Sequence, residues 1–145
     1  IIMQGKEFIN NLVRVGDSKG PVVGAVGCSL RTITGDKLQE AGSIVWRDAS
    51  AAAFGRDRKD LEAPEFNYPR PVDYVSGACL MVKKHIFQSY GGFDGKNFPN
   101  YYEDTDLQLH VQHDLHKQVW VVPKAVAVHD EHGSFGAEDA RRKMQ

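Results

Sequence analysis

The stretch NYYEDTDL, residues 100–107, places three carboxylates within four positions, directly behind two tyrosines. It leads into a run in which Leu107, Val111 and Leu115 recur at every fourth position, and this spacing predicts one buried stripe along a helix. Asp104 falls on the same face at its N-terminal end, whereas its acidic neighbours point elsewhere. A carboxylate aimed along the buried face at the mouth of a helix can act as a general base.

The same stretch also fits ordinary helix-start chemistry. Thr105 followed by Gln108 matches a capping box, and acidic residues in a first turn interact favourably with the helix macrodipole. Spacing alone leaves the catalytic and the structural interpretations open, so the rest of the chain has to decide between them.

Size and charge narrow the classes of protein to consider. The chain has 145 residues, enough for one domain with a real core, and a formal net charge of −1, which gives no electrostatic basis for a nucleic-acid partner. No run of residues reaches the length of a membrane helix.

Cys28 and Cys79 lie in apolar, strand-like runs and are interpreted as free thiols of a reducing compartment. We therefore expect a cytoplasmic protein, including one at the cytoplasmic face of a membrane.

Alternating helical and strand-like segments predict an α/β fold. Residues 8–13 repeat as a helix face, and residues 21–27 form a continuous apolar run typical of a strand that is buried on both faces. Residues 84–90 fit a short helix closed by two glycines, and the acidic helix is expected from about residue 104 to residue 116.

The remaining segments are less regular. Residues 72–82 suit one strand, in which Gly77 indicates a bulge or a close approach of the backbone to another group. A strand over residues 119–122 is expected to stop at Pro123. Residues 47–71 predict a long loop with at most one short helix, either a lid or binding loop or a solvated excursion, and residues 133–145 predict a polar tail.

In this order the motifs resemble the C-terminal half of family 2 glycosyltransferases, the inverting GT-A group, with most similarity to its rhamnosyltransferase-like members. The resemblance is carried by VDYVSGACLMVKK (72–84), GGFD (91–94), YEDTDL (102–107) and the segment from Val122–Pro123 to His129. Weaker similarity in VGAVG (23–27), AGSI (41–44) and FGR (54–56) extends it over nearly the whole chain. It implies a partial GT-A fold, a central mixed sheet flanked by helices, with residues 1–145 as one domain.

The resemblance also implies roles for individual residues. Asp104 would be the general base that takes the proton from an acceptor hydroxyl during inverting transfer. The residues implied in substrate binding are Glu103, Gly77, Ser76, Tyr102 and Asp73. His129 would ligate a metal or contact the diphosphate, and the alternative is a hydrogen-bonded residue at the boundary of a strand. His132, three residues further on, could replace it.

The implied partners are a nucleotide-sugar donor and a carbohydrate or lipid-linked acceptor, as in cell-wall or polysaccharide biosynthesis, and no nucleic acid. The implied cofactor is Mn²⁺ or Mg²⁺, held mainly by an Asp-x-Asp motif in an N-terminal nucleotide-binding half that residues 1–145 lack. Without that half we expect this chain to be inactive by itself. We also expect an exposed sheet edge to favour a homodimer.

Two other hypotheses stay open at this point. The chain could be a catalytically silent binding or relic module of the same fold. It could also be a metal-dependent hydrolase, provided that Glu103, Asp104, Asp106 and His129 converge on one ion.

Overall fold

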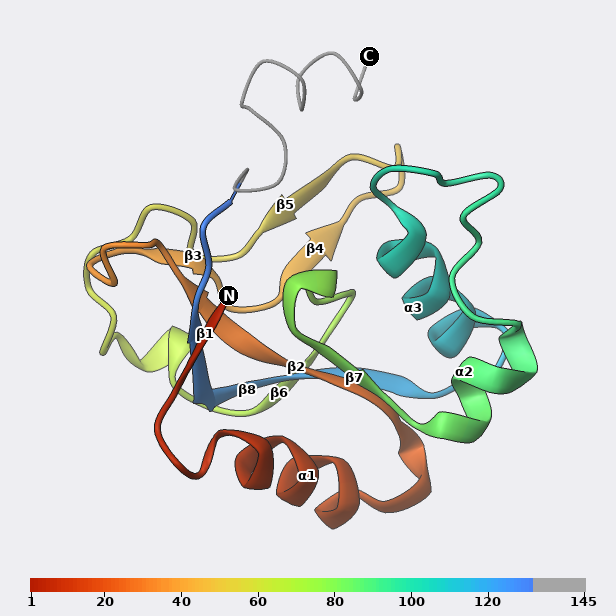
Figure 1. Ribbon diagram of the computed structural model, residues 1–145, viewed down its shortest axis with the longest axis horizontal. Helices are drawn as coiled ribbons and strands as arrows, with labels where there is room; N and C mark the ends of the chain where they lie inside the picture. The colour runs from red at the N-terminus through yellow and green to blue at the C-terminus, as the bar shows by residue number, and fades with distance from the viewer. Residues whose placement is uncertain (132–145) are drawn as a thin grey trace.

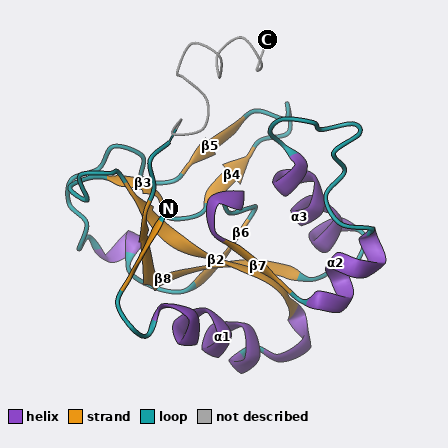
Figure 2. Cartoon of the chain, in the orientation of Figure 1, coloured by secondary structure: helices purple, strands orange, loops and turns teal. Residues whose placement is uncertain are grey.

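The structure, a computed structural model, describes residues 1–131, so the predicted tail (133–145) and His132 lie outside the described residues. Figures 1 and 2 show a curled sheet with helices on both sides. The helices and strands are β1 (Ile2–Gln4), α1 (Phe8–Ser18), η1 (Gly20–Val22), β2 (Val23–Arg31), β3 (Leu38–Glu40), β4 (Ser43–Val45), β5 (Ala51–Ala53), η2 (Pro64–Phe66), β6 (Arg70–Val72), η3 (Gly77–Cys79), β7 (Leu80–Val82), α2 (Lys84–Tyr90), α3 (Glu103–His113) and β8 (Gln118–Val128), the η elements being short 3₁₀ helices.

Strands β2 and β8 form the centre of the sheet and run parallel, with Val26 opposite Trp120. All other pairings are antiparallel: β1 and β6 lie on β8, and β3 and β7 lie on β2. Within residues 1–131 these six strands form one sheet, and β4 pairs with β5 in a separate ribbon. The predicted α/β fold with a central mixed sheet flanked by helices is therefore confirmed, and it is consistent with part of a nucleotide-sugar transferase fold.

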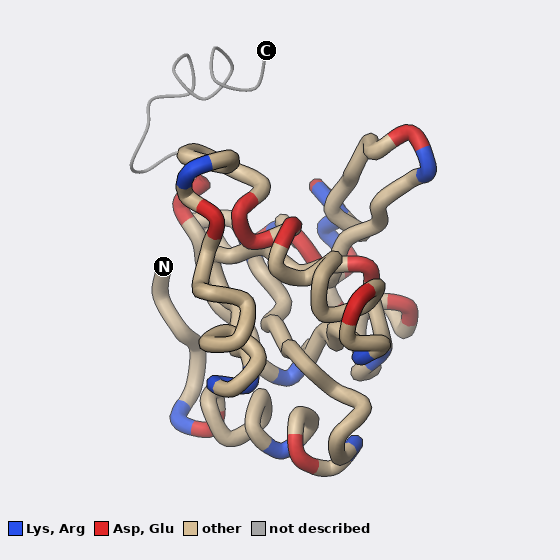
Figure 3. The backbone as a smooth tube through the Cα atoms, turned by 90° about the vertical axis from the view of Figure 1, so that its right-hand side faces the viewer, with Lys and Arg blue, Asp and Glu red and all other residues tan. Residues whose placement is uncertain are grey.

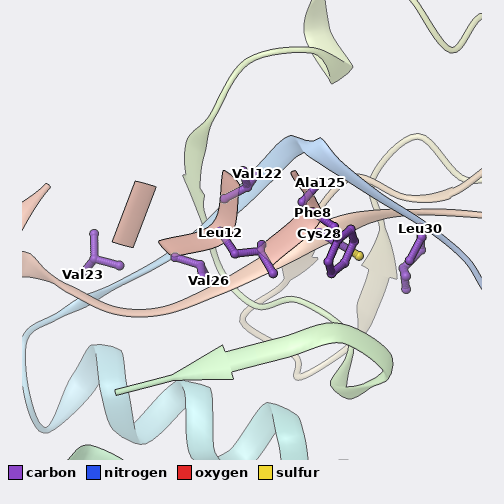
Figure 4. Close-up of a cluster of buried hydrophobic side chains, with 9 residues drawn as sticks. Phe8, Leu12, Val23, Val26, Cys28, Leu30, Val122 and Ala125 are labelled. Atoms are coloured by element: carbon purple, nitrogen blue, oxygen red, sulfur yellow. The ribbon is translucent and has the colours of Figure 1, made fainter. Parts of the chain in front are cut away.

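The two central strands are covered on both faces. On one face, α1 packs Phe8 and Leu12 against β2 and β8, and Figure 4 shows this cluster of buried side chains. On the other face, Val111 of α3 packs against Ala25 and Val119. Because successive strand residues point to opposite faces, both sets of β2 residues are buried, which explains the continuous apolar run in the sequence.

Within residues 1–131 no helix is long and apolar enough to cross a bilayer.

Gly24 lets α3 pack closely onto β2. A Cβ atom at this position would lie 2.6 Å from Val111 Cγ1 and 3.2 Å from Ile86 Cδ1. We expect Gly24→Ala to lower the free energy of unfolding by about 1–3 kcal/mol, because an extra methyl group in a packed core forces its neighbours to move. Urea denaturation measures this change. The matched control is Gly95→Ala, whose added Cβ meets nothing within 4 Å; equal stability of the two variants would contradict the prediction.

The predicted strand over residues 72–82 is wrong. Strand β6 ends at Val72, a 3₁₀ turn follows at Gly77–Cys79, and β7 begins only at Leu80. The reason lies in the partners of the backbone amides. The amides of residues 76, 77 and 78 donate to side-chain oxygens instead of a neighbouring strand, so the ladder is interrupted there.

The prediction that Pro123 stops a strand is also wrong. Strand β8 runs through Pro123 to Val128, and the sheet accommodates the proline where the register slips. Cys28 pairs with Val122, but the next residue, Ser29, pairs with Val126. Residues in such an irregularity need no ladder bond, so the missing N–H of proline costs little there.

The helix predictions are confirmed within a few residues. Helix α2 spans Lys84–Tyr90 and ends at Gly91, whose φ of 91° is the left-handed conformation that glycine adopts readily. Helix α3 spans Glu103–His113 and buries Leu107 and Val111 completely.

Residues 47–71 are mostly irregular, but they contribute β5, the 3₁₀ turn η2 and the start of β6.

Candidate functional site

The chain enters α3 through two consecutive residues in an unfavourable backbone conformation. Tyr101 and Tyr102 have φ values of 68° and 70°, in the left-handed region that bulky side chains rarely adopt. The Tyr102 carbonyl accepts a hydrogen bond from the Asp106 amide at 2.8 Å, which closes the first helical turn. Backbone strain of this kind costs of order 1–3 kcal/mol per residue and gathers at binding and catalytic sites. The start of α3 is therefore one side of the candidate site.

Asp104 lies against the 3₁₀ turn that precedes β7. Its Oδ2 accepts a hydrogen bond from the Gly77 amide at 2.5 Å, and its Oδ1 accepts one from the Thr105 amide at 2.8 Å. Only glycine fits at position 77, because an added Cβ would lie 2.9 Å from both Cβ and Oδ2 of Asp104. The close approach predicted at Gly77 is thus an approach to Asp104 itself. The half-buried carboxylate is held in one orientation by both of its oxygens.

Gln108 fixes the first turn of α3 to the same segment. Its side chain is fully buried and pairs with both polar groups of Val75: Oε1 accepts from the amide at 2.8 Å, and Nε2 donates to the carbonyl at 2.8 Å. A second bond from Nε2 reaches the Asp104 carbonyl at 2.9 Å. The predicted capping box of Thr105 and Gln108 is therefore wrong, because α3 already begins at Glu103 and the Gln108 side chain bonds to Val75 and to the Asp104 carbonyl instead of an amide at the helix start.

Glu40, at the end of β3, is the residue of this site that the sequence analysis missed. Its side chain is only 6% exposed, and Oε1 accepts a hydrogen bond from the Ser76 amide at 2.8 Å. Burial raises the pKa of Glu40 to about 7, the negative charge of Asp104 adds to this, and the Ser76 amide opposes it. Strand β3 is short and mixes apolar and polar residues, so it shows no alternation of apolar and polar positions that would have indicated a buried Glu40.

His129 follows directly after β8 and is held by the neighbour of Glu40 in β3. The Nδ1 atom of His129 lies 3.0 Å from Gln39 Oε1, and the backbone amide of His129 donates to the Arg31 carbonyl at 2.9 Å. Strand β3 thus connects His129, through Gln39 and Glu40, with the turn to which Asp104 is hydrogen-bonded. These residues lie near the carboxyl ends of the two parallel strands, which is where α/β sheets bind their ligands.

The other predicted site residues differ in their hydrogen bonds and in their exposure. The Asp73 carboxylate accepts a hydrogen bond from the Val45 amide at 2.8 Å and so ties β4 to the segment after β6. Glu103 is half-buried, and its Oε2 is buried without a hydrogen-bond partner among the described residues. The Tyr102 side chain is 49% exposed. The exposed Tyr102 ring therefore offers a surface to a ligand, the buried Oε2 of Glu103 lacks a partner among the described residues, and Asp73 has a structural bond.

A metal centre is not formed by the described residues. Within residues 1–131 no three His, Cys, Asp or Glu side chains lie together so that they could hold an ion. Asp104 and Asp106 have different partners, the Gly77 amide and the Tyr90 hydroxyl, the latter at 2.5 Å. The hydrolase hypothesis, which needs the acidic residues of this stretch to converge with His129 on one ion, is not supported.

Charge alone does not single out the site. Figure 3 shows acidic and basic residues interspersed along the described chain. The specific features are the hydrogen bonds and the burial of individual carboxylates, which only the folded structure reveals.

Sequence comparisons relate part of the chain to a known protein. No protein-family model matches the chain. Over 97 residues the chain is 39% identical to N-acetylglucosaminyl-diphospho-decaprenol L-rhamnosyltransferase of Mycobacterium tuberculosis, in strains H37Rv and CDC 1551, over 65% of this chain and 28% of the transferase. This region of the chain is glycosyltransferase-like.

A second relative covers more of the chain. Over 140 residues the chain is 36% identical to an uncharacterized protein of Sinorhizobium fredii (strain NBRC 101917 / NGR234), over 94% of this chain and 15% of that protein. The chain thus spans less than a third of the length of either relative.

Proposed function

We propose that this chain is the acceptor-side part of an inverting family 2 glycosyltransferase with Asp104 as its general base. The observation that carries the proposal is the position of the Asp104 carboxylate. It is hydrogen-bonded to Gly77 near the carboxyl ends of the central parallel strands, in a chain of which 65% is similar to a glycosyltransferase.

The proposed reaction transfers one sugar from a nucleotide-sugar donor to a hydroxyl group of a glycan or lipid-linked acceptor. The acceptor oxygen forms a bond to the anomeric carbon on the face opposite the leaving group, and the bond from that carbon to the diphosphate oxygen breaks. The proton of the acceptor hydroxyl passes to the Asp104 carboxylate. The Gly77 and Thr105 amides hold this carboxylate in a fixed orientation, so the base is positioned before the acceptor binds.

Substrate contacts are proposed for the residues around the base. The Glu103 carboxylate, whose buried Oε2 has no partner among the described residues, would orient acceptor hydroxyls, and the exposed ring of Tyr102 can stack against a sugar. Ser76 and Gly77 would line the same place through their backbone, and Asp73 would support it through β4. His129 would contact the donor diphosphate or its Mn²⁺ or Mg²⁺ ion, although no step above depends on that ion. A cytoplasmic location and a homodimer through a sheet edge stay predictions.

A transfer assay tests the proposed function. The complete protein would be incubated with UDP- and dTDP-activated sugars, including the rhamnosyl derivative, and with an N-acetylglucosaminyl-diphospho-prenol acceptor. We expect the acceptor to gain the mass of one sugar residue, with an inverted anomeric configuration by NMR. If the protein transfers none of these sugars and calorimetry detects no nucleotide-sugar binding, the silent binding module becomes the better interpretation.

A further inference from the structure

Two carboxylates from different parts of the chain bind successive amides of one turn. Glu40 of β3 accepts from the Ser76 amide at 2.8 Å, and Asp104 of α3 accepts from the Gly77 amide at 2.5 Å. The next amide, that of Ala78, donates to the Ser76 hydroxyl at 3.2 Å. The turn therefore owes its conformation to these side chains, and the placement of one carboxylate depends on the other.

The burial of Glu40 is unusual for a residue of its type. Acidic side chains are almost never fully buried without a paired cation, because removing their charge from water is costly. Glu40 is 6% exposed, yet among residues 1–131 it forms no ion pair with any Lys, Arg or His. The guanidinium of Arg56 lies on the same side but is bonded to Glu131 at 2.5 Å. A group in this situation keeps its proton more easily than an exposed carboxylate does.

We propose that Glu40 is a positioning residue for Asp104. Glu40 fixes the turn to which the candidate base, Asp104, is hydrogen-bonded, and the protonation of Glu40 is coupled to the charge of Asp104. The inference rests on the proposed function of Asp104 and extends it to a second, buried carboxylate.

The groups that face Glu40 support this coupling. They are Asp104 of α3, Arg56 after β5, Ser43 of β4, Tyr74 before the turn, Ser76 and Cys79 at the two ends of the turn, and Cys28 of β2. Burial, followed by the negative charge of Asp104, raises the pKa of Glu40 to about 7, while the Ser76 amide, the Ser43 hydroxyl and the Arg56 charge oppose the rise. Because the two carboxylates bind adjacent amides of one turn, the charge of Asp104 acts on the protonation of Glu40.

An NMR titration of the ¹⁵N-labelled full chain tests the proposal without any substrate. The amide signal of Ser76 is followed from about pH 5 to pH 9, a range that brackets the expected midpoint. In the wild type we expect a transition centred near pH 7, because this amide is bonded to Glu40. Glu40→Gln should abolish the transition, and Asp104→Asn should move its midpoint to lower pH. The matched control Glu62→Gln, at an exposed glutamate, should leave it unchanged.

Three outcomes would overturn the proposal. They are a Ser76 signal without a transition in the wild type, a transition that survives Glu40→Gln, and a midpoint that Asp104→Asn does not move. The Asp104→Asn arm tests the coupling independently of the Glu40 variant. Because the titration needs neither donor nor acceptor, its failure is distinct from the absence of sugar transfer, which would count against the proposed function alone.

Discussion

Asp104→Asn should lower the rate of sugar transfer by a factor of about 10²–10⁴, the usual contribution of a positioned general base. Asparagine has nearly the same shape, and its side-chain oxygen can still accept the hydrogen bond that the Gly77 amide donates to Asp104, whereas its Nδ2 cannot accept the one from the Thr105 amide. It cannot accept the acceptor proton, however, because its amide is not basic. The measurement compares kcat of the variant and the wild type with the donor and acceptor identified in the transfer assay.

The control for this experiment lies on the same helix. Asp114 follows the last turn of α3, where its exposed carboxylate pairs with His110 at 2.7 Å, and Asp114→Asn should leave the rate unchanged. The thermal midpoint of Asp104→Asn should stay close to that of the wild type, and the dissociation constant of the donor should not change. Near-normal turnover in Asp104→Asn would reject Asp104 as the base.

Glu40→Gln should make the protein more stable at pH 8, by roughly 3 kcal/mol. The pKa of Glu40 rises from its ordinary value of 4.5 to about 7 on folding. Each unit of pKa difference between the folded and unfolded states corresponds to about 1.4 kcal/mol. As the pH rises through this interval the unfolded chain releases its proton first, so the wild type loses stability between about pH 4.5 and pH 7. Glutamine carries no proton to lose and can still accept the hydrogen bond of the Ser76 amide.

Urea denaturation at several pH values checks this prediction. Near pH 4.5 the two proteins should be similar, because the wild-type side chain is then largely protonated and resembles glutamine. The difference should grow up to about pH 7 and then stay constant. Glu62→Gln, at an exposed glutamate, should show no such trend. A Glu40→Gln protein that is less stable than the wild type at pH 8 would mean that the charge of Glu40 stabilises the fold.

Local patterns predicted those parts of the fold that local chemistry determines. The double glycine that ends α2 and the apolar stripe of α3 define these helices wherever they pack. The continuous apolar run of β2 indicates a strand covered on both faces. In contrast, residues 72–82 have strand-like composition, but their amides are bound by side chains from distant segments, and no local pattern reveals such partners.

The candidate site was also predictable only where local sequence patterns determine it. A helix-face argument placed Asp104 on the buried side, and a glycine in a strand-like run predicted the close approach at Gly77. Glu40 was not identified, and Gln108 was assigned only a cap, because the bonds from Gln108 to Val75 and from Glu40 to Ser76 span more than thirty positions of the sequence. A polar residue whose only signal is its tertiary partner looks like any other surface residue in a sequence.

The paired left-handed tyrosines at the start of α3 have a consequence for protein engineering. Among the described residues, Tyr101 and Tyr102 are the only adjacent non-glycine residues with positive φ, and a glycine at either position would adopt this backbone without cost. Local preference therefore works against both rings, and the surrounding fold must hold them in place. Exchanging one of them for glycine would remove an aromatic surface and relax the loop, while Asp104 would keep its bond to Gly77. Acceptor preference could then be altered at this loop independently of proton transfer.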